Sequence, residues 1–271
     1  TCPPPNPVAQ IPVFKSFSFS IISDDCFSVS SINNCIIGES DNWALIGGLF
    51  DGAGAISVFV FGKLVCLFDD DSGDNFINIV QNFNIAKDAI RKNYKIDMKK
   101  NSNIKYFYNN IDLDKNSVCE NFILSTGSKF IKNEINCNLN EQHSSAFING
   151  IMKLKNSQHH EIKTNINHLA ENTKSYQLIK SVLNDNAKGV YQGKIFVDAK
   201  AQKTNGYQLS KALLLNNDTE FNGKPELEIY ADDVKCSHGS TSGNLDENSI
   251  FYLMSRGLNR KQSKELLING F

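Results

Sequence analysis

The sequence predicts a mainly β protein that ends in a short helical segment. Apolar and polar residues alternate in short stretches, each followed by a polar stop such as Asn156-Ser157 or Asn216-Asn217. No long helical pattern separates these stretches, whereas the last 28 residues change to helical spacing with recognisable caps. Short strands without intervening helices are typical of a sandwich, a barrel or a coil of strands.

The first quarter of the chain has a different composition from the rest. Residues 1–10 contain four prolines, which predicts an irregular tail. The residues that follow are apolar and rich in Gly and Phe, and only Lys15 and Lys63 of the 25 lysines come before residue 69. This change divides the chain into an N-terminal segment of unassigned role, a β core and a helical segment, at residues 1–68, 69–243 and 244–271.

Charge and cysteine usage exclude several classes of function. The 28 basic and 29 acidic residues give no field that would gather phosphates or anionic lipid, so we expect neither nucleic acid nor a membrane as partner. The most membrane-like stretch, Trp43 to Gly62, contains Asp51 and five glycines and favours a buried strand pair. The seven cysteines lack a C-x-x-C motif, which favours reduced thiols and a cytoplasmic protein. Thr1 in place of Met indicates a fragment or a processed start.

The alternation is most regular after Ser117. Ile131, Ile135, Cys137 and Leu139 share one face of a segment whose other face is polar, which predicts a half-buried strand. Residues 75–93 fit a helix and a strand equally well. Segments like the one at 131–139 recur at residues 147–154, 162–169, 194–198, 213–215 and 227–231.

The 34 asparagines favour the coil of strands among the three architectures. Asparagine adopts the left-handed conformation that the corners of such a coil require, and stacked asparagines hydrogen-bond from one coil to the next. A coil also has an open end whose unpaired backbone groups invite another strand. We therefore expect a partner to cover the residues near 240.

The final segment predicts two short helices. Leu245-Asp246 followed by Ile250 fits an N-cap with a hydrophobic staple, and Gly257 is a suitable end for this helix. Asn259 with Gln262 begins the second helix in the same way. Two such helices attached to a β body form a docking module or a lid.

The stretch from Leu227 to Gly243 is the densest set of reactive side chains. Cys236 and His238 project from the same face of a strand, about 6 to 7 Å apart at the backbone, and can reach one metal or each other. A buried Cys beside a hydrogen-bonded His is the alternative without a functional role. A Cys–His nucleophile lacks an orienting third group, and the loop Gly239 to Gly243 lacks the lysine of a phosphate loop.

The other four histidines are predicted to lie on the surface or in turns. His159 and His160 are adjacent and point to opposite faces of any strand, so they do not form a joint ligand pair. His143 and His168 lie in or beside strand-like segments.

The run from Gly189 to Gly257 resembles the SufB/SufD family of iron–sulfur cluster assembly proteins. The similarity rests on GVYQGKIFVDAKAQKTNGYQLSKALLL and KPELEIYADDVKCSHGSTSGNLDENSIFYLMSRGL, and its weaker part reaches back to about residue 100. The stretch ADDVKCSHG indicates the SufD branch. The family's helical N-terminal domain has no counterpart in residues 1–55.

The resemblance implies a right-handed parallel β-helix with a short C-terminal helical segment, including a strand rather than a helix at Tyr176 to Leu183. It implies a non-catalytic scaffold that pairs with SufB through its last strands, while the SufC ATPase docks on the helices. His238 is then a ligand for a transient iron–sulfur cluster shared with SufB, with Cys236 a weaker one and Asp232 or Asp233 as the acceptor of the second imidazole N–H. The residues expected to contact SufC are Phe251, Tyr252, Leu253, Arg256 and Leu266.

A carbohydrate-active β-helix enzyme or glycan-binding protein is the alternative function. It requires carboxylates along an exposed groove and aromatic rings for stacking on sugars, whereas most acids here lie in turns and the chain has one Trp. No residue pattern assigns or excludes a flavin.

Overall fold

The computed structural model describes residues 76–98 and 101–271, with side chains from residue 103 onward in the second range, and the backbone of six strands between residues 13 and 65. The predicted tail at 1–10 and residues 47–57 of the membrane-like stretch lie outside the described residues. Where the chain is described, no helix combines the length and apolar character needed to cross a bilayer. The N-terminal strands are β1 Val13–Ser23, β2 Cys26–Val29, β3 Cys35–Glu39, β4 Asn42–Ile46, β5 Val58–Phe61 and β6 Lys63–Val65.

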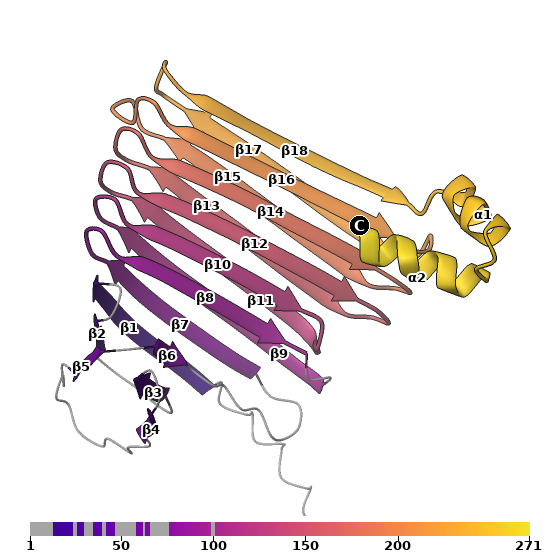
Figure 1. Ribbon diagram of the computed structural model, residues 1–271, viewed down its shortest axis with the longest axis horizontal. Coiled ribbons are helices and arrows are strands. Elements are labelled where there is room, and N and C mark those ends of the chain that lie inside the picture. Colours follow the sequence, from indigo (N-terminus) through magenta and orange to yellow (C-terminus); the bar gives the residue numbers. More distant parts are fainter. Residues whose placement is uncertain are drawn as a thin grey trace, which may run out of the picture.

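The rest of the β body is a parallel β-helix made of two sheets that face each other (Figure 1). The first sheet contains β7 Phe76–Ile85, β9 Asn101–Leu113, β11 Ser128–Leu139, β13 His159–His168, β15 Lys188–Val197 and β17 Glu220–Ile229, and continues through β1, β2 and β5. The second sheet contains β8 Ile90–Asp97, β10 Val118–Ser125, β12 Ser145–Leu154, β14 Lys174–Leu183, β16 Asn205–Leu214 and β18 Lys235–Asn244.

Consecutive strands alternate between the two sheets, and each pairs in parallel with the strand two places along. Ser145 lies opposite Lys174, and Lys174 opposite Asn205, so one coil takes about 30 residues. Of the sandwich, the barrel and the coil of strands that short strands allow, this arrangement is the coil of strands. It confirms the predicted parallel β-helix. Residues 75–93, which the sequence left open between helix and strand, contain β7 and the start of β8. The predicted strand at 176–183 lies in β14.

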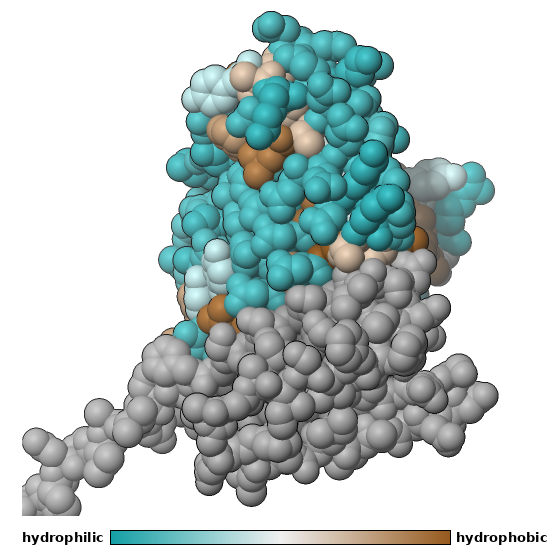
Figure 2. All heavy atoms as spheres, turned by 90° about the vertical axis from the view of Figure 1, so that its left-hand side faces the viewer, coloured by the Kyte–Doolittle hydropathy of each residue, from teal (hydrophilic) through white to brown (hydrophobic). Residues whose placement is uncertain are grey.

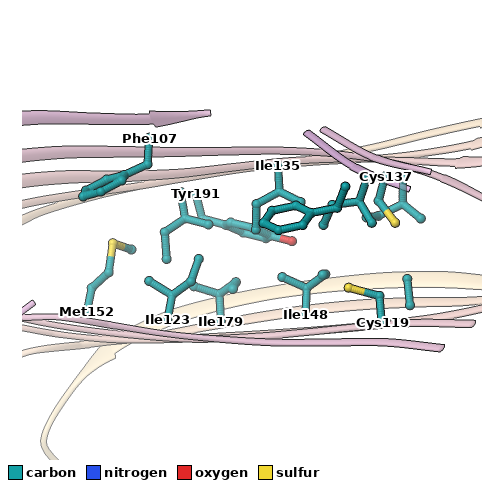
Figure 3. Packing of buried hydrophobic residues seen from close by; sticks show 14 of the residues in the cluster. Phe107, Cys119, Ile123, Ile135, Cys137, Ile148, Met152, Ile179 and Tyr191 are labelled. Atoms are coloured by element: carbon teal, nitrogen blue, oxygen red, sulfur yellow. The ribbon is translucent and has the colours of Figure 1, made fainter. Parts of the chain in front are cut away.

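The core fills the space between the two sheets. Ile131, Ile135, Cys137 and Leu139 are buried as their alternation predicts. Figure 3 shows Phe107, Ile135, Cys137 and Tyr191 of the first sheet facing side chains of the second sheet, which are Cys119, Ile123, Ile148, Met152 and Ile179. Each coil buries its inward row against the coils before and after it, so the core is continuous along the helix axis.

Asparagine is used both at the corners and along the strands. Left-handed backbone recurs at the turns, at Asp88, Asn116, His143, Asn156, Asn172, Asp185 and Lys203. Asn110, Asn136 and Asn165 form a ladder on the outer side of the first sheet, in which each amide donates to the oxygen of the coil before, at 2.7 and 3.0 Å. The sequence predicted the stacking at the corners, and the structure places most of it along the strands. Among the described residues, hydrophilic ones dominate the side of the molecule seen in Figure 2.

Two helices follow the β body within the described residues, α1 Glu247–Ser255 and α2 Arg260–Gly270. Asp246 caps α1 by accepting the backbone N–H groups of Asn248 and Ser249, and Asn259 with Gln262 forms a capping box on α2. Gly257 has φ of +98°, the left-handed conformation that ends a helix. These caps confirm both predicted helix starts and the predicted stop.

Candidate functional site

The β-helix is open at its C-terminal end. In the described structure β17 and β18 are the last strands of their sheets, and each pairs with a neighbour on one side only. Side chains that point inward in the coils below are covered by the next coil, but those of β17 and β18 have no further coil above them and are exposed or half-buried. Cys236 and His238 occupy two of these inward positions, above Gly206 and Gln208 of β16.

Cys236 turns its thiol into the coil below. Its Sγ lies over Gly206, where a Cβ would approach the sulfur to 3.3 Å, so the glycine provides the space that the thiol fills. Cys236 also packs against the small apolar cluster of Ile195 and Val197. Burial raises the pKa of this thiol, although a contact with the Gly206 backbone partly offsets the effect. In the chain alone Cys236 is therefore a neutral thiol at neutral pH.

His238 lies two residues further along β18 and is exposed. Among the described residues its ring forms no hydrogen bond or ion pair, so both nitrogens are available to a ligand. Asp232 and Asp233, the predicted acceptors, lie in the exposed turn before β18, and neither carboxylate bonds the imidazole. A third orienting group is likewise absent from this part of the structure, which argues against a Cys–His nucleophile.

Two of the other histidines are not surface residues, and that prediction is wrong for them. His160 and His168 point into the core and are completely buried. The ring nitrogens of His160 contact Ser125 Oγ and Ser128 O at 2.8 Å, and those of His168 contact Thr173 Oγ1 and Ser175 Oγ at 2.7 and 2.9 Å. Burial lowers the pKa of each to about 4. They are structural residues because all of their hydrogen-bonding groups are used internally.

No three His, Cys, Asp or Glu side chains of the described residues come together as a metal site. Cys236 and His238 together supply two ligands, whereas an iron–sulfur cluster as a whole is typically held by four thiolate or imidazole ligands. A metal or cluster at this end therefore needs ligands from another molecule or from exchangeable groups. The open end of the β-helix therefore presents an accessible but incomplete set of potential metal ligands.

The helical segment presents apolar side chains to solvent. α1 buries Ile250 but leaves Phe251 73% and Tyr252 56% exposed, and Leu266 of α2 is 51% exposed. Arg256 lies over the Tyr252 ring at 5.3 Å. A groove of about 430 Å³ runs between the helices and is lined by Asp246, Asn248, Ser249, Tyr252, Leu253, Leu266 and Leu267.

An exposed ion pair links α1 to α2. Arg260 donates two hydrogen bonds to the Glu247 carboxylate, at 2.8 and 2.9 Å. The predicted SufC contacts include Tyr252, Leu253 and Leu266 of the groove but not Leu267, which also lines it, nor Met254, which is 41% exposed. The sequence signal for Leu267 and Met254 was that each lies next to a predicted contact on the same helix.

These observations define a β-helical protein that presents potential metal ligands at an open end and an apolar helical segment beside it. The chain belongs to the family described as SUF system FeS cluster assembly, SufBD core domain, whose model matches residues 62–271. The family membership agrees with the resemblance seen in the sequence.

Curated relatives named for iron–sulfur cluster assembly match different parts of the chain. The iron–sulfur cluster assembly protein SufD of Escherichia coli is 29% identical over 240 residues, which cover 89% of this chain and 56% of that protein. A SufBD family protein of Synechocystis is 40% identical over 113 residues, 42% of this chain and 24% of the relative. A SufBD family protein of Mycobacterium leprae is 23% identical over 266 residues, 95% of this chain and 66% of the relative. The chain thus spans about half the length of E. coli SufD.

Proposed function

We propose that this chain is a SufD-branch scaffold that assembles an iron–sulfur cluster together with a sister β-helix protein, SufB, and an ATPase, SufC, in the cytoplasm. The ADDVKCSHG stretch and the similarity to E. coli SufD support the branch. The cluster is the cargo of the complex, and the chain itself catalyses no reaction. We place ATP hydrolysis on SufC because the sequence contains no G-x-x-x-x-G-K-[ST] motif.

The observation that supports this proposal most strongly is that the inward side chains of β17 and β18 are left exposed or half-buried. A strand edge that is paired on one side offers backbone groups to a strand of the same kind, as a sister β-helix would supply. Such a partner would bring its own ligands to the half-site of Cys236 and His238. His238 is the first ligand because it is exposed and free, whereas the Cys236 thiol must first lose a proton and turn outward.

The helical segment is the proposed SufC site. Phe251, Tyr252 and Leu266 form an apolar surface that the β body does not cover, and Arg256 adds a cation at its edge. Leu253 lines the groove between the helices. Exposed aromatic and Arg side chains of this kind are typical centres of protein interfaces.

The carbohydrate alternative receives no support from the surface. Most outward acids of the first sheet pair with lysines, as in Glu134 with Lys163 at 2.6 Å and Glu161 with Lys132 at 3.7 Å, while Asp112 accepts asparagine amides. Paired carboxylates on a polar sheet face do not form the two-carboxylate groove that glycoside hydrolysis needs.

Replacing His238 tests the cluster role. We expect the His238→Ala chain to fold and to form the complex with SufB and SufC, but to carry at least about tenfold less iron and sulfide after anaerobic purification. His159→Ala is the control, because His159 is an outward histidine of the first sheet. Normal iron and sulfide content in the His238 variant would reject the role.

Removing the helices tests the SufC site. A chain that ends at Gly243 retains every strand except the last residue of β18, so we expect unchanged β structure by circular dichroism and loss of SufC in co-purification. Phe251→Ala with Tyr252→Ala should weaken the same interaction about a hundredfold without shortening the chain. Retention of SufC by the shortened chain would refute the assignment.

A further inference from the structure

The two sheets differ in the side chains that they present outward. In the first sheet, the outward positions of β11 and β13 hold charged and amide side chains that bond from coil to coil, such as Lys163 to Glu134 and Asn167 to Asn138. In the second sheet about half of the outward positions are aromatic or aliphatic. The helix α2 contacts this outer face at Leu213 and Lys180.

Two rows of this face are apolar. In the first row Phe147, Tyr176 and Tyr207 lie opposite one another on β12, β14 and β16, and they are 36%, 38% and 39% exposed. The second row, two residues further along the strands, consists of Tyr94, Phe122, Asn149, Leu178 and Leu209. We call these two rows the apolar rows. Contiguous exposed apolar side chains of this extent mark a binding surface.

Lysines flank the apolar rows on both sides. Lys174 and Lys235 lie on the row before them, and Lys180 and Lys211 on the row after them. Among the outward side chains of these six strands, all of them described, Glu120 is the single acid, and it pairs with Lys92 at 3.3 Å. Across β14 and β16 the apolar rows thus lie between Lys174 on one side and Lys180 and Lys211 on the other.

The helix α2 shows how a helix meets this face. A groove between α2 and Leu213, an outward residue of β16, is lined by Leu266, Leu267 and Phe271. Lys180 donates to the Phe271 carbonyl oxygen at the end of α2, at 2.5 Å, and lies 5.6 Å from the ring centre. Contact of Leu213 with the leucines of α2, and of a lysine with a carbonyl oxygen, is therefore already present at the edge of the face.

We propose that the apolar rows bind an amphipathic α-helix of a partner protein whose edges carry aspartate or glutamate. The apolar side of this helix lies across the strands on Tyr176, Tyr207 and Leu178, and its carboxylates pair with Lys174 on one edge and Lys211 on the other. This surface lies on the outer side of the second sheet and adjoins the open end at Lys235 and the proposed SufC site at Leu266, and the inference does not depend on the cluster role.

The dimensions fit one helix. The rows cross five strands, about 19 Å at 4.8 Å per strand, which is the length of about 13 helical residues. The lysine rows lie six residues apart along the strands, about 20 Å, and a helix with its side chains is about 10 to 12 Å wide. Carboxylates on both edges of a helix between these rows are therefore within reach of the lysine side chains.

Two synthetic helical peptides test the proposal with the full chain. Both have 14 residues and a leucine face; one has glutamates along its edges and the other has lysines in the same places. We expect the glutamate peptide to bind at least about tenfold more tightly by fluorescence anisotropy at low salt. Equal affinities of the two peptides would overturn the proposal, as would no binding of either.

Variants of the face locate the binding. Lys174→Glu with Lys211→Glu should reverse the peptide preference, and Tyr176→Ser with Tyr207→Ser should weaken both peptides at least about tenfold. Lys163→Glu with Lys194→Glu on the first sheet is the matched control and should leave the preference unchanged. Unaltered binding by the tyrosine variant would overturn the proposal. Sedimentation measures whether the chain forms a dimer. A dimer that dissociates only in the tyrosine variant would assign the face to a second copy of the chain and would also overturn the proposal.

Discussion

His168 in the middle of the β-helix and His238 at its end both point inward from a strand, but their environments are opposite. His168 is covered by coils on both sides, both of its ring nitrogens are bonded, and burial lowers its pKa to about 4. His238 has no coil above it and its ring bonds no described residue. Cys137 and Cys236 differ in the same way, since Cys137 is fully buried and Cys236 half-buried.

For side chains that point inward, this difference shows that the position of the coil, rather than the type of side chain, decides whether a ligand residue is available. An inward thiol or imidazole of a middle coil is buried in the core, whereas one of the last coil remains available to a partner or a cargo. The comparison predicts different responses to mutation, pH and chemical labelling at the two places.

Substitutions that leave a cavity should show the largest difference in stability between the middle coils and the last coil. Ile179 of β14 is fully buried in the main core, so Ile179→Ala should lower the free energy of unfolding by about 2 to 5 kcal/mol. Leu227 of β17 is an inward residue of the last coil and only partly buried, so Leu227→Ala should cost about 1 kcal/mol in the isolated chain. Urea unfolding measures both. Equal costs would show that the last coil is as well packed as the middle.

The buried histidines should make the protein sensitive to acid. Burial lowers the pKa of His160 and His168 from 6.5 to about 4, so the unfolded chain binds more protons than the folded chain between these values. Their contribution to stability is complete above pH 6.5 and is lost as the pH falls towards 4, by about 3 kcal/mol for each.

Unfolding in urea at pH 7 and pH 4.5 measures this effect. A chain with His160→Gln and His168→Gln should show a smaller difference between the two conditions, while His238→Gln should not change it. A full acid effect in the double variant would contradict the assignment to the buried pair.

The sequence was sufficient for the local features of this fold and insufficient for the coil order. The caps at Asp246 and Asn259 were predictable because they depend on residues within one turn of helix. The inward positions followed from alternation. Alternation does not show which neighbouring strands supply hydrogen-bond partners to an inward polar residue, so His160 and His168 were wrongly expected on the surface. The pair Cys236 and His238 was recognised from its spacing, and its exposure required the topology.

The apolar rows were missed because their members are far apart in the chain. Tyr176-Gln177-Leu178 and Tyr207-Gln208-Leu209 repeat one coil apart, and each tyrosine and leucine lies opposite its counterpart. A search for repeats at about 30 residues would have found this pair. The repeat alone would not have shown that the lysines flank it, because that follows from the register of the strands.

The reactivity of the cysteines should differ between the core and the last coil, a smaller effect that reports on single residues. Burial raises the pKa of Cys119 and Cys137, whose side chains lie in the core, so both should react with iodoacetamide only when the chain unfolds. Cys236 should be alkylated slowly in the native chain, faster at pH 9 than at pH 7. Peptide mass spectrometry reads each site separately, and labelling of Cys137 at the rate of Cys236 would remove the distinction.

Hydrogen exchange of the last coil tests the central claim most directly. The account predicts that backbone amides of β17 and β18 exchange rapidly in the isolated chain and become strongly protected when the chain is bound to SufB, while those of β12 and β13 are protected in both states. If β17 and β18 are equally protected with and without the partner, the open end is not where a sister protein completes the coil, and the account is wrong.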